Sequence, residues 1–177
     1  MDDRTVFKRV EKSWNEIGKE KCSKYLGTLT TEVIRHALQE NGIPTSGRDV
    51  FIRGIPIEFD LIIPRQGANC LEGILYDPED VIAVLEIKTS GLFDYNSIER
   101  IEHCRNKVQE ANSSIFYGYV TLTERQSFYN KIFGKNIPDW VFTLSWCKRV
   151  KGIEYCEEIK DSWQKLLSEL HKCIDAR

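Results

Sequence analysis

The run Val81–Lys88, with the sequence VIAVLEIK, constrains the fold of this chain more than any other segment. Six of its eight residues are apolar, and this pattern is typical of a strand covered on both faces. Such a strand needs neighbouring strands at its sides and other elements packed on each face. The sequence therefore predicts an α/β fold with this segment as its central strand.

Helical and strand patterns surround the central strand. Apolar residues at steps of three and four predict an amphipathic helix over 5–25 and a second helix over 30–40. Runs of β-branched residues on either side of Gly54 predict a strand pair, and the polar segment that follows is expected to be a loop. The remaining expected elements are strands over 50–53 and 55–63, a loop over 64–80, a helix over 97–111, a strand over 115–122, a short helix near 128–133, a strand over 139–146 and a C-terminal amphipathic helix over 163–174.

A β-hairpin is predicted near the C-terminus from a two-residue turn at 151–152. This turn pairs Val150 with Ile153 and brings Cys147 opposite Cys156. A cross-strand disulfide is sterically possible at this pair. Because the chain has six cysteines and no secretion signal, reduced thiols are expected instead.

Composition limits the classes of protein to consider. With 177 residues, 41% of them hydrophobic and 29% charged, the chain is expected to form one folded domain over 1–177. The 25 basic and 27 acidic residues give a net charge of −2, so any contact with nucleic acid must depend on local patches. No apolar stretch is long enough for a membrane span, and the charged N-terminus differs from a signal peptide. A cytoplasmic protein without a membrane partner is expected.

Charged residues interrupt the most apolar strand segments and are the main functional signal. Asp60 lies within IPIEFDLIIP, and Glu86 and Lys88 share one face of the central strand because side chains alternate. A buried charge is costly unless it is paired or binds a metal. If the two strands are neighbours, the carboxylates of Asp60 and Glu86 would form an oxygen site for Mg²⁺ or Mn²⁺, with the backbone carbonyl of Ile87 as a further ligand. Lys88 would orient the attacking water or offset developing negative charge.

These residues resemble the motif of the PD-(D/E)xK superfamily, the restriction-endonuclease-like nucleases. The match consists of Asp60, 25 intervening residues and then Glu86, Ile87 and Lys88, with Phe59 where the family motif has proline. The expected element order over 30–122 is similar to the αβββαβ core of that family. The resemblance implies a mixed central sheet flanked by helices, with an added N-terminal helix and a C-terminal hairpin and helix. It also implies that the two acids bind Mg²⁺ and that the lysine takes part in catalysis.

Three further acids are secondary candidates. Many members of the family carry a glutamate on the first core helix, and Glu32 and Glu40 are the candidates here. A solvated helix glutamate is the favoured interpretation of Glu32, and a frayed helix end is the alternative for Glu40. Glu58 is expected on the same face as Asp60, either as a surface acid or as an auxiliary metal contact.

Phosphate contacts are expected outside the acidic stretch, because Glu58 to Glu86 contains seven acids and one arginine. Residues that follow the motif or lie near the predicted turn are candidates, with a solvated surface as the alternative. They are Thr89, Ser90, Lys148, Arg149 and Lys151.

The sequence therefore predicts a metal-dependent nuclease that hydrolyses phosphodiester bonds in DNA, and a homodimer is compatible with it. The residues by themselves do not distinguish DNA from RNA. The alternative prediction is an inactive nucleic-acid-binding or assembly module on the same fold, in which the acids and Lys88 form an ion-pair network.

Overall fold

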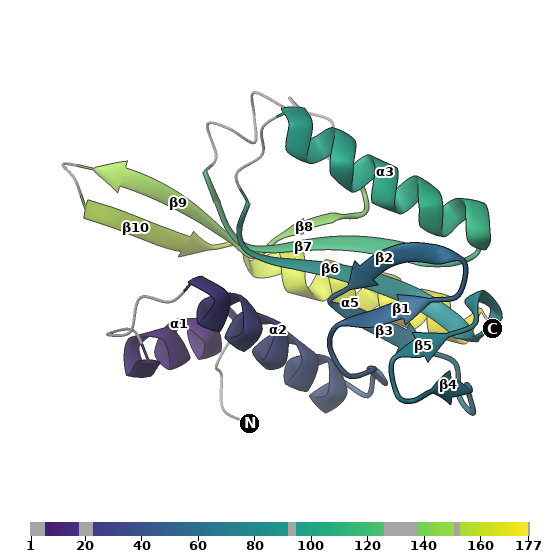
Figure 1. Cartoon of the computed structure of the whole chain (residues 1–177). Coiled ribbons are helices and arrows are strands. Elements are labelled where there is room, and N and C mark those ends of the chain that lie inside the picture. The colour runs from purple at the N-terminus through teal and green to yellow at the C-terminus, as the bar shows by residue number, and fades with distance from the viewer. Residues whose placement is uncertain (1–5, 18–22, 92–94, 126–137, 151–152, 177) are drawn as a thin grey trace.

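The strand predicted from the apolar run is β6 (Val81–Gly91), and it lies inside a six-stranded mixed sheet (Figure 1). The other strands of this sheet are β3 (Leu61–Pro64), β7 (Phe116–Arg125), β8 (Val141–Thr143), β9 (Ser145–Val150) and β10 (Ile153–Glu158). Their order is β10-β9-β7-β6-β3, with β8 also paired to β7. β6 runs antiparallel to β3 and parallel to β7, so both of its edges are hydrogen-bonded.

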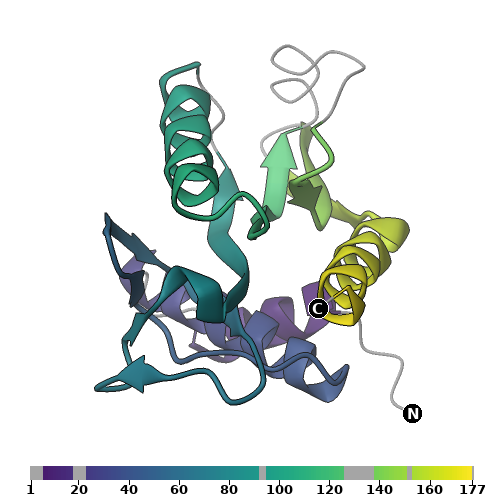
Figure 2. The same cartoon turned by 90° about the vertical axis from the view of Figure 1, so that its right-hand side faces the viewer.

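Helices cover both faces of this sheet, as the buried central strand requires. The structure is a computed structural model that describes residues 6–17, 23–91, 95–125, 138–150 and 153–176. The described α-helices are α1 (Val6–Ile17), α2 (Ser23–Glu40), α3 (Tyr95–Ala111) and α5 (Lys160–Asp175). Figures 1 and 2 show α3 on one side of the sheet and α1, α2 and α5 on the other.

Alternate side chains of β6 enter two separate apolar cores. Leu85 and Ile87 pack with residues of α1, α2 and α5, whereas Val84 packs on the opposite face with residues of α3. Both cores are buried, and Val84 and Leu85 have no exposed surface at all. The prediction of a strand covered on both faces is confirmed.

A smaller sheet lies beside β3. Its strands are β1 (Val50–Ile52), β2 (Ile55–Phe59), β4 (Cys70–Leu71) and β5 (Leu75–Tyr76), and a 3₁₀ turn, η1 (Pro78–Asp80), leads into β6. The strand predicted over 55–63 is therefore divided at Asp60, with β2 in the small sheet and β3 in the large one. The segment 64–80, which was expected to be a loop, contributes two short strands: β5 pairs with the free edge of β1, and β4 pairs with β5.

The start of α2 corrects a second boundary. The helix was expected near Thr30, after an interruption at Gly27, but it begins at Ser23 and continues through Gly27. Continuing the helix through Gly27 keeps the backbone N–H and C=O groups of this segment hydrogen-bonded. The Thr30 hydroxyl also donates to the Leu26 carbonyl at 2.8 Å. The first predicted helix is described as α1, and the short helix predicted near 128–133 lies outside the described residues.

The predicted hairpin register is confirmed. β9 and β10 are antiparallel, with Val150 opposite Ile153 and Cys147 opposite Cys156. The cysteines are joined by a disulfide, so the expectation of reduced thiols at this pair is wrong for this structure. The non-hydrogen-bonded spacing of facing residues in an antiparallel pair brings two such thiols within bonding reach.

Candidate functional site

Asp60, Glu86 and Lys88 lie together where β2 bends into β3 beside β6. Leu61 pairs with Leu85 in antiparallel strands. Asp60, which precedes Leu61, therefore faces Glu86, which follows Leu85. The Asp60 Oδ2 atom accepts a hydrogen bond from the Ile87 backbone amide at 2.7 Å and lies 3.5 Å from Lys88 Nζ. Lys88 Nζ also forms an ion pair with Glu86 Oε1. One ammonium group therefore bridges the two carboxylates.

Partial burial strengthens the electrostatic coupling in this cluster. The exposed fractions of the side chains are 26% for Asp60, 23% for Glu86 and 42% for Lys88. Burial, followed by repulsion from Asp60, raises the pKa of Glu86. Burial alone would lower the pKa of Lys88, but the two carboxylates outweigh it and raise the pKa. The lysine is therefore held in its charged form.

Two pockets meet at Lys88. The Asp60 pocket, of about 510 Å³, also opens to the first part of α2, the segment before β1 and Glu58. The Glu86 pocket, of about 520 Å³, lies between β6 and α3 and includes Arg100. The Asp60 pocket is lined by Gly27, Thr28, Thr31, Arg48, Asp49, Glu58, Asp60, Ile87, Lys88 and Thr89. Small molecules or a phosphate group can thus approach Lys88 from either side.

The donor set at the junction fits a hard divalent cation in its chemistry. Two carboxylates and the Ile87 carbonyl are oxygen donors of the kind that Mg²⁺ and Mn²⁺ prefer. Burial is the main cause of the raised pKa of Glu86, and the nearby Asp60 carboxylate adds to it. Within the described residues, no group of three or more His, Cys, Asp or Glu side chains is arranged to hold a metal ion. Any cation here would depend on the two acids, the backbone carbonyl and water.

The secondary acids have three different environments. Glu58 is exposed and lines the Asp60 pocket. Glu40, at the end of α2, forms a 2.6 Å ion pair with Arg9 of α1 and thereby joins two helices. Glu32 is half-buried on α2 and pairs with Arg35 at 2.7 Å and with Arg48 at 2.9 Å. Neither Glu32 nor Glu40 is among the residues lining the pockets at Lys88.

Thr89 and Ser90, which follow the motif, lie at the site. Lys148, the hairpin candidate whose side chain the structure describes, does not. Thr89 lines the Asp60 pocket, and its hydroxyl is 3.3 Å from that of Thr30. Ser90 lines the Glu86 pocket. Lys148 on β9 is separated from β6 by β7 and forms a 3.7 Å ion pair with Glu157. The side chain of Arg149 and all of Lys151 lie outside the described residues.

Arg48 is one of the pocket residues that the sequence does not single out. It belongs to the segment between α2 and β1, and it is joined in the pocket wall by two threonines of α2. A lone arginine in a polar segment has no periodicity or spacing that marks it as functional. Only the folding of this segment against β3 brings it beside Asp60.

The two helix-covered faces and the mixed sheet form a restriction-endonuclease-like α/β fold. No family model and no curated protein matches the chain. Its structure is similar to that of NucC from P. aeruginosa ATCC27853 in the cAAA-bound form, with a TM-score of 0.62 at 12% sequence identity. The match covers 95% of this chain and 88% of the NucC chain. At this identity the similarity establishes the fold and not the chemistry. No helix in the described part of the chain is long and apolar enough to cross a membrane.

Proposed function

We propose that this protein is a divalent-metal-dependent nuclease that hydrolyses phosphodiester bonds in DNA. The observation that carries the proposal is the bridging of the Asp60 and Glu86 carboxylates by Lys88 at the junction of two pockets. At the level of the fold, the likeness to NucC supports a nuclease. A cluster of two acids and a lysine with access to solvent is suited to a reaction in which negative charge develops on phosphate oxygens.

In this proposal, Asp60, Glu86 and the Ile87 carbonyl hold Mg²⁺ or Mn²⁺. The cation would polarise the phosphodiester and lower the pKa of a bound water. The hydrogen bond from the Ile87 amide fixes the Asp60 carboxylate on the strand that carries the other two groups. This attachment positions the carboxylates relative to each other before substrate arrives.

Lys88 contributes charge and orientation. Its ammonium donates to the acids in the structure and can turn towards a phosphate oxygen or a water, because its side chain is partly exposed and borders both pockets. Hydrolysis forms a bond between water oxygen and phosphorus, breaks the bond to the leaving sugar oxygen and transfers a proton to that oxygen. The charged lysine stabilises the negative charge that accumulates on the phosphate during this step.

A second candidate function is an inactive nucleic-acid-binding or assembly module. It is favoured by the same ion pairs, because an ammonium between two carboxylates also forms a self-sufficient structural network. The two candidates differ in whether Lys88 and Asp60 are required for turnover.

Cleavage of linear and circular DNA in Mg²⁺ or Mn²⁺ tests the proposal. We expect cleavage by the wild-type chain, and a loss of about a hundredfold or more in Lys88→Ala and Asp60→Ala. Lys172→Ala and Asp77→Ala are matched controls, since each removes a charge from an exposed ion pair away from the site. These controls should cut at nearly the wild-type rate. Cleavage that persists in both site variants, or that is absent from the wild type under all conditions, contradicts the proposal and favours the binding module.

A further inference from the structure

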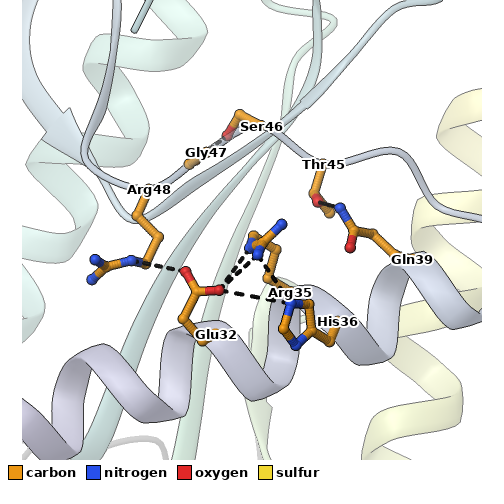
Figure 3. Close-up of polar contacts among 8 residues, drawn as sticks. All are labelled: Glu32, Arg35, His36, Gln39, Thr45, Ser46, Gly47 and Arg48. Carbon is orange, nitrogen blue, oxygen red and sulfur yellow. Dashed lines mark hydrogen bonds and ion pairs between the residues drawn. The ribbon is translucent and has the colours of Figure 1, made fainter. Parts of the chain in front are cut away.

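The Asp60 pocket contains an arginine whose position is fixed by contacts that leave its outer edge free. Arg48 Nε is 2.9 Å from Glu32 Oε1. Figure 3 shows its two terminal nitrogens directed away from Glu32, and among the described residues neither has a hydrogen bond or ion pair. Such an arrangement presents two N–H donors in one plane, which is the geometry that binds two oxygens of a phosphate.

The segment that carries Arg48 is attached directly to the strand of the site. The Ser46 amide donates to the Ile62 carbonyl at 2.8 Å, and the Ser46 hydroxyl accepts from the Ile62 amide at 2.9 Å. Ser46 is buried, and Ile62 follows Asp60 by two positions on β3. Arg48 therefore has a fixed position relative to Asp60.

The backbone conformation next to Arg48 is a second indication that the surrounding structure determines the position of this residue. Asp49 has a φ of +57°, in the left-handed region that non-glycine residues seldom adopt. Such a conformation costs on the order of 1 kcal/mol and persists where the surroundings determine it. Asp49 and Arg48 both line the Asp60 pocket, so the strained turn directs this segment into the pocket wall.

Charge at Glu32 also favours an anion beside Arg48. A single carboxylate pairs with two guanidinium groups, from Arg35 and Arg48 (Figure 3). Burial would raise the pKa of Glu32, but the hydrogen bond and charge of Arg35, with help from Arg48, lower it. The carboxylate is thus ionised, and among Glu32, Arg35 and Arg48 the charges sum to +1, while Asp49, Glu58 and Asp60 are the acids that line the same pocket as Arg48.

We infer that Arg48 binds a phosphate of the nucleic-acid backbone in the Asp60 pocket and that Glu32 is the positioning residue that orients it. This inference rests on the proposed function and adds a substrate-binding residue to it. It gives Glu32 a role different from that of a metal-binding helix glutamate. Lys88 and Arg48 then contact the substrate from two walls of one pocket.

Arg35 provides the matched control. It shares Glu32 with Arg48, and it is not among the residues lining the Asp60 pocket. Removal of either arginine breaks an ion pair with Glu32, so Arg35→Ala and Arg48→Ala should lower the melting temperature by similar amounts. Only Arg48→Ala removes a phosphate contact.

Salt-dependent binding of a short fluorescent DNA, single-stranded or duplex, separates the two roles. The measurement uses the full chain with Asp60→Asn as background, which removes turnover and retains an acceptor for the Ile87 amide. We expect Arg48→Ala to weaken binding about tenfold and to reduce the slope of log affinity against log salt by about one. Arg48→Lys should retain the slope, because the charge remains, and lose about threefold in affinity, because the paired donors are gone. Arg35→Ala should match the background in both quantities.

The outcomes distinguish this inference from the proposed function. Equal affinity and slope in Arg48→Ala and Arg35→Ala overturn the role of Arg48, even if the wild-type chain cuts DNA. Absence of cleavage by the wild type overturns the nuclease, whereas the loss of slope specific to Arg48 would still support the phosphate contact. Failure of the Asp60→Asn chain to bind either DNA overturns the inference.

Discussion

Two glutamates on neighbouring parallel strands are both largely buried, but they differ in the groups that surround them. Glu86 on β6 contacts Lys88, lies near Asp60 and borders a pocket. Glu124 on β7 is only 2% exposed. Its Oε1 accepts from the Arg125 amide at 2.9 Å, while its buried Oε2 has no hydrogen-bond partner among the described residues.

Burial raises the pKa of both carboxyl groups, so a raised pKa does not by itself mark a functional site. It raises the pKa of Glu124 to about 7, with the Arg125 amide and charge opposing the shift. At Glu86 a second carboxylate adds to the effect of burial and an ammonium opposes it. The two glutamates differ in the groups that converge on them and in their access to the pockets at Lys88. Glu86 lines one of these two pockets, and Glu124 lines neither.

The largest expected difference between the two glutamates is in catalysis. Glu86→Gln should reduce Mg²⁺-dependent DNA cleavage by about a hundredfold or more, because an amide is a poorer and uncharged ligand for a divalent cation. Glu124→Gln should cut within about twofold of the wild type. Initial rates at saturating DNA for both variants provide the measurement. Equal losses of cleavage in the two variants would show that the burial of a glutamate, and not its place beside Asp60 and Lys88, determines the loss.

The motif residues could be predicted from the sequence because strand alternation is a local rule. The apolar run fixed β6 as central, and alternation placed Glu86 and Lys88 on one face. Contact with Asp60 required only that β3 and β6 be neighbours, which the structure confirms. The register of the C-terminal hairpin followed in the same way from a two-residue turn.

Features that depend on tertiary contacts could not be predicted. The segment 55–63 has no glycine or proline beside Asp60 to signal a strand break, yet the chain passes from one sheet to the other there. The strand expected to end at Leu122 continues to Arg125, because pairing of Gly91 with Glu124 extends the ladder through polar residues. Glu124 therefore became buried without any signal in the sequence. Arg48 likewise reaches the Asp60 pocket only through the packing of its segment on β3.

The free energy of unfolding, measured as a function of pH, tests the effect of burying Glu124. Its pKa is about 7 in the folded chain and near the ordinary value of 4.5 when unfolded, so the folded state binds the additional proton between these values. Stability contributed by this group therefore falls as pH rises through that window. Glu124→Gln has no charge to bury and should be more stable than the wild type by about 1 to 3 kcal/mol near pH 8, with little difference near pH 4.5.

Denaturant unfolding of the two chains at both pH values checks this expectation, with Glu79→Gln as a control on an exposed glutamate. A difference of the same size at both pH values would mean that the Glu124→Gln substitution acts through packing and not through charge.

The smallest expected effect concerns the ammonium between the carboxylates. Lys88→Met removes a cation that competes with Mg²⁺ for Asp60 and Glu86, so millimolar Mg²⁺ or Mn²⁺ should stabilise this variant more than the wild type. A tenfold gain in cation affinity corresponds to about 1.4 kcal/mol, or a few degrees in melting temperature. Adding Glu86→Gln to Lys88→Met should abolish the additional shift, and adding Glu124→Gln should leave it intact. If Glu124→Gln abolishes it as well, the cation is not held by the Asp60 and Glu86 pair, because only one of the two buried glutamates has a second carboxylate beside it.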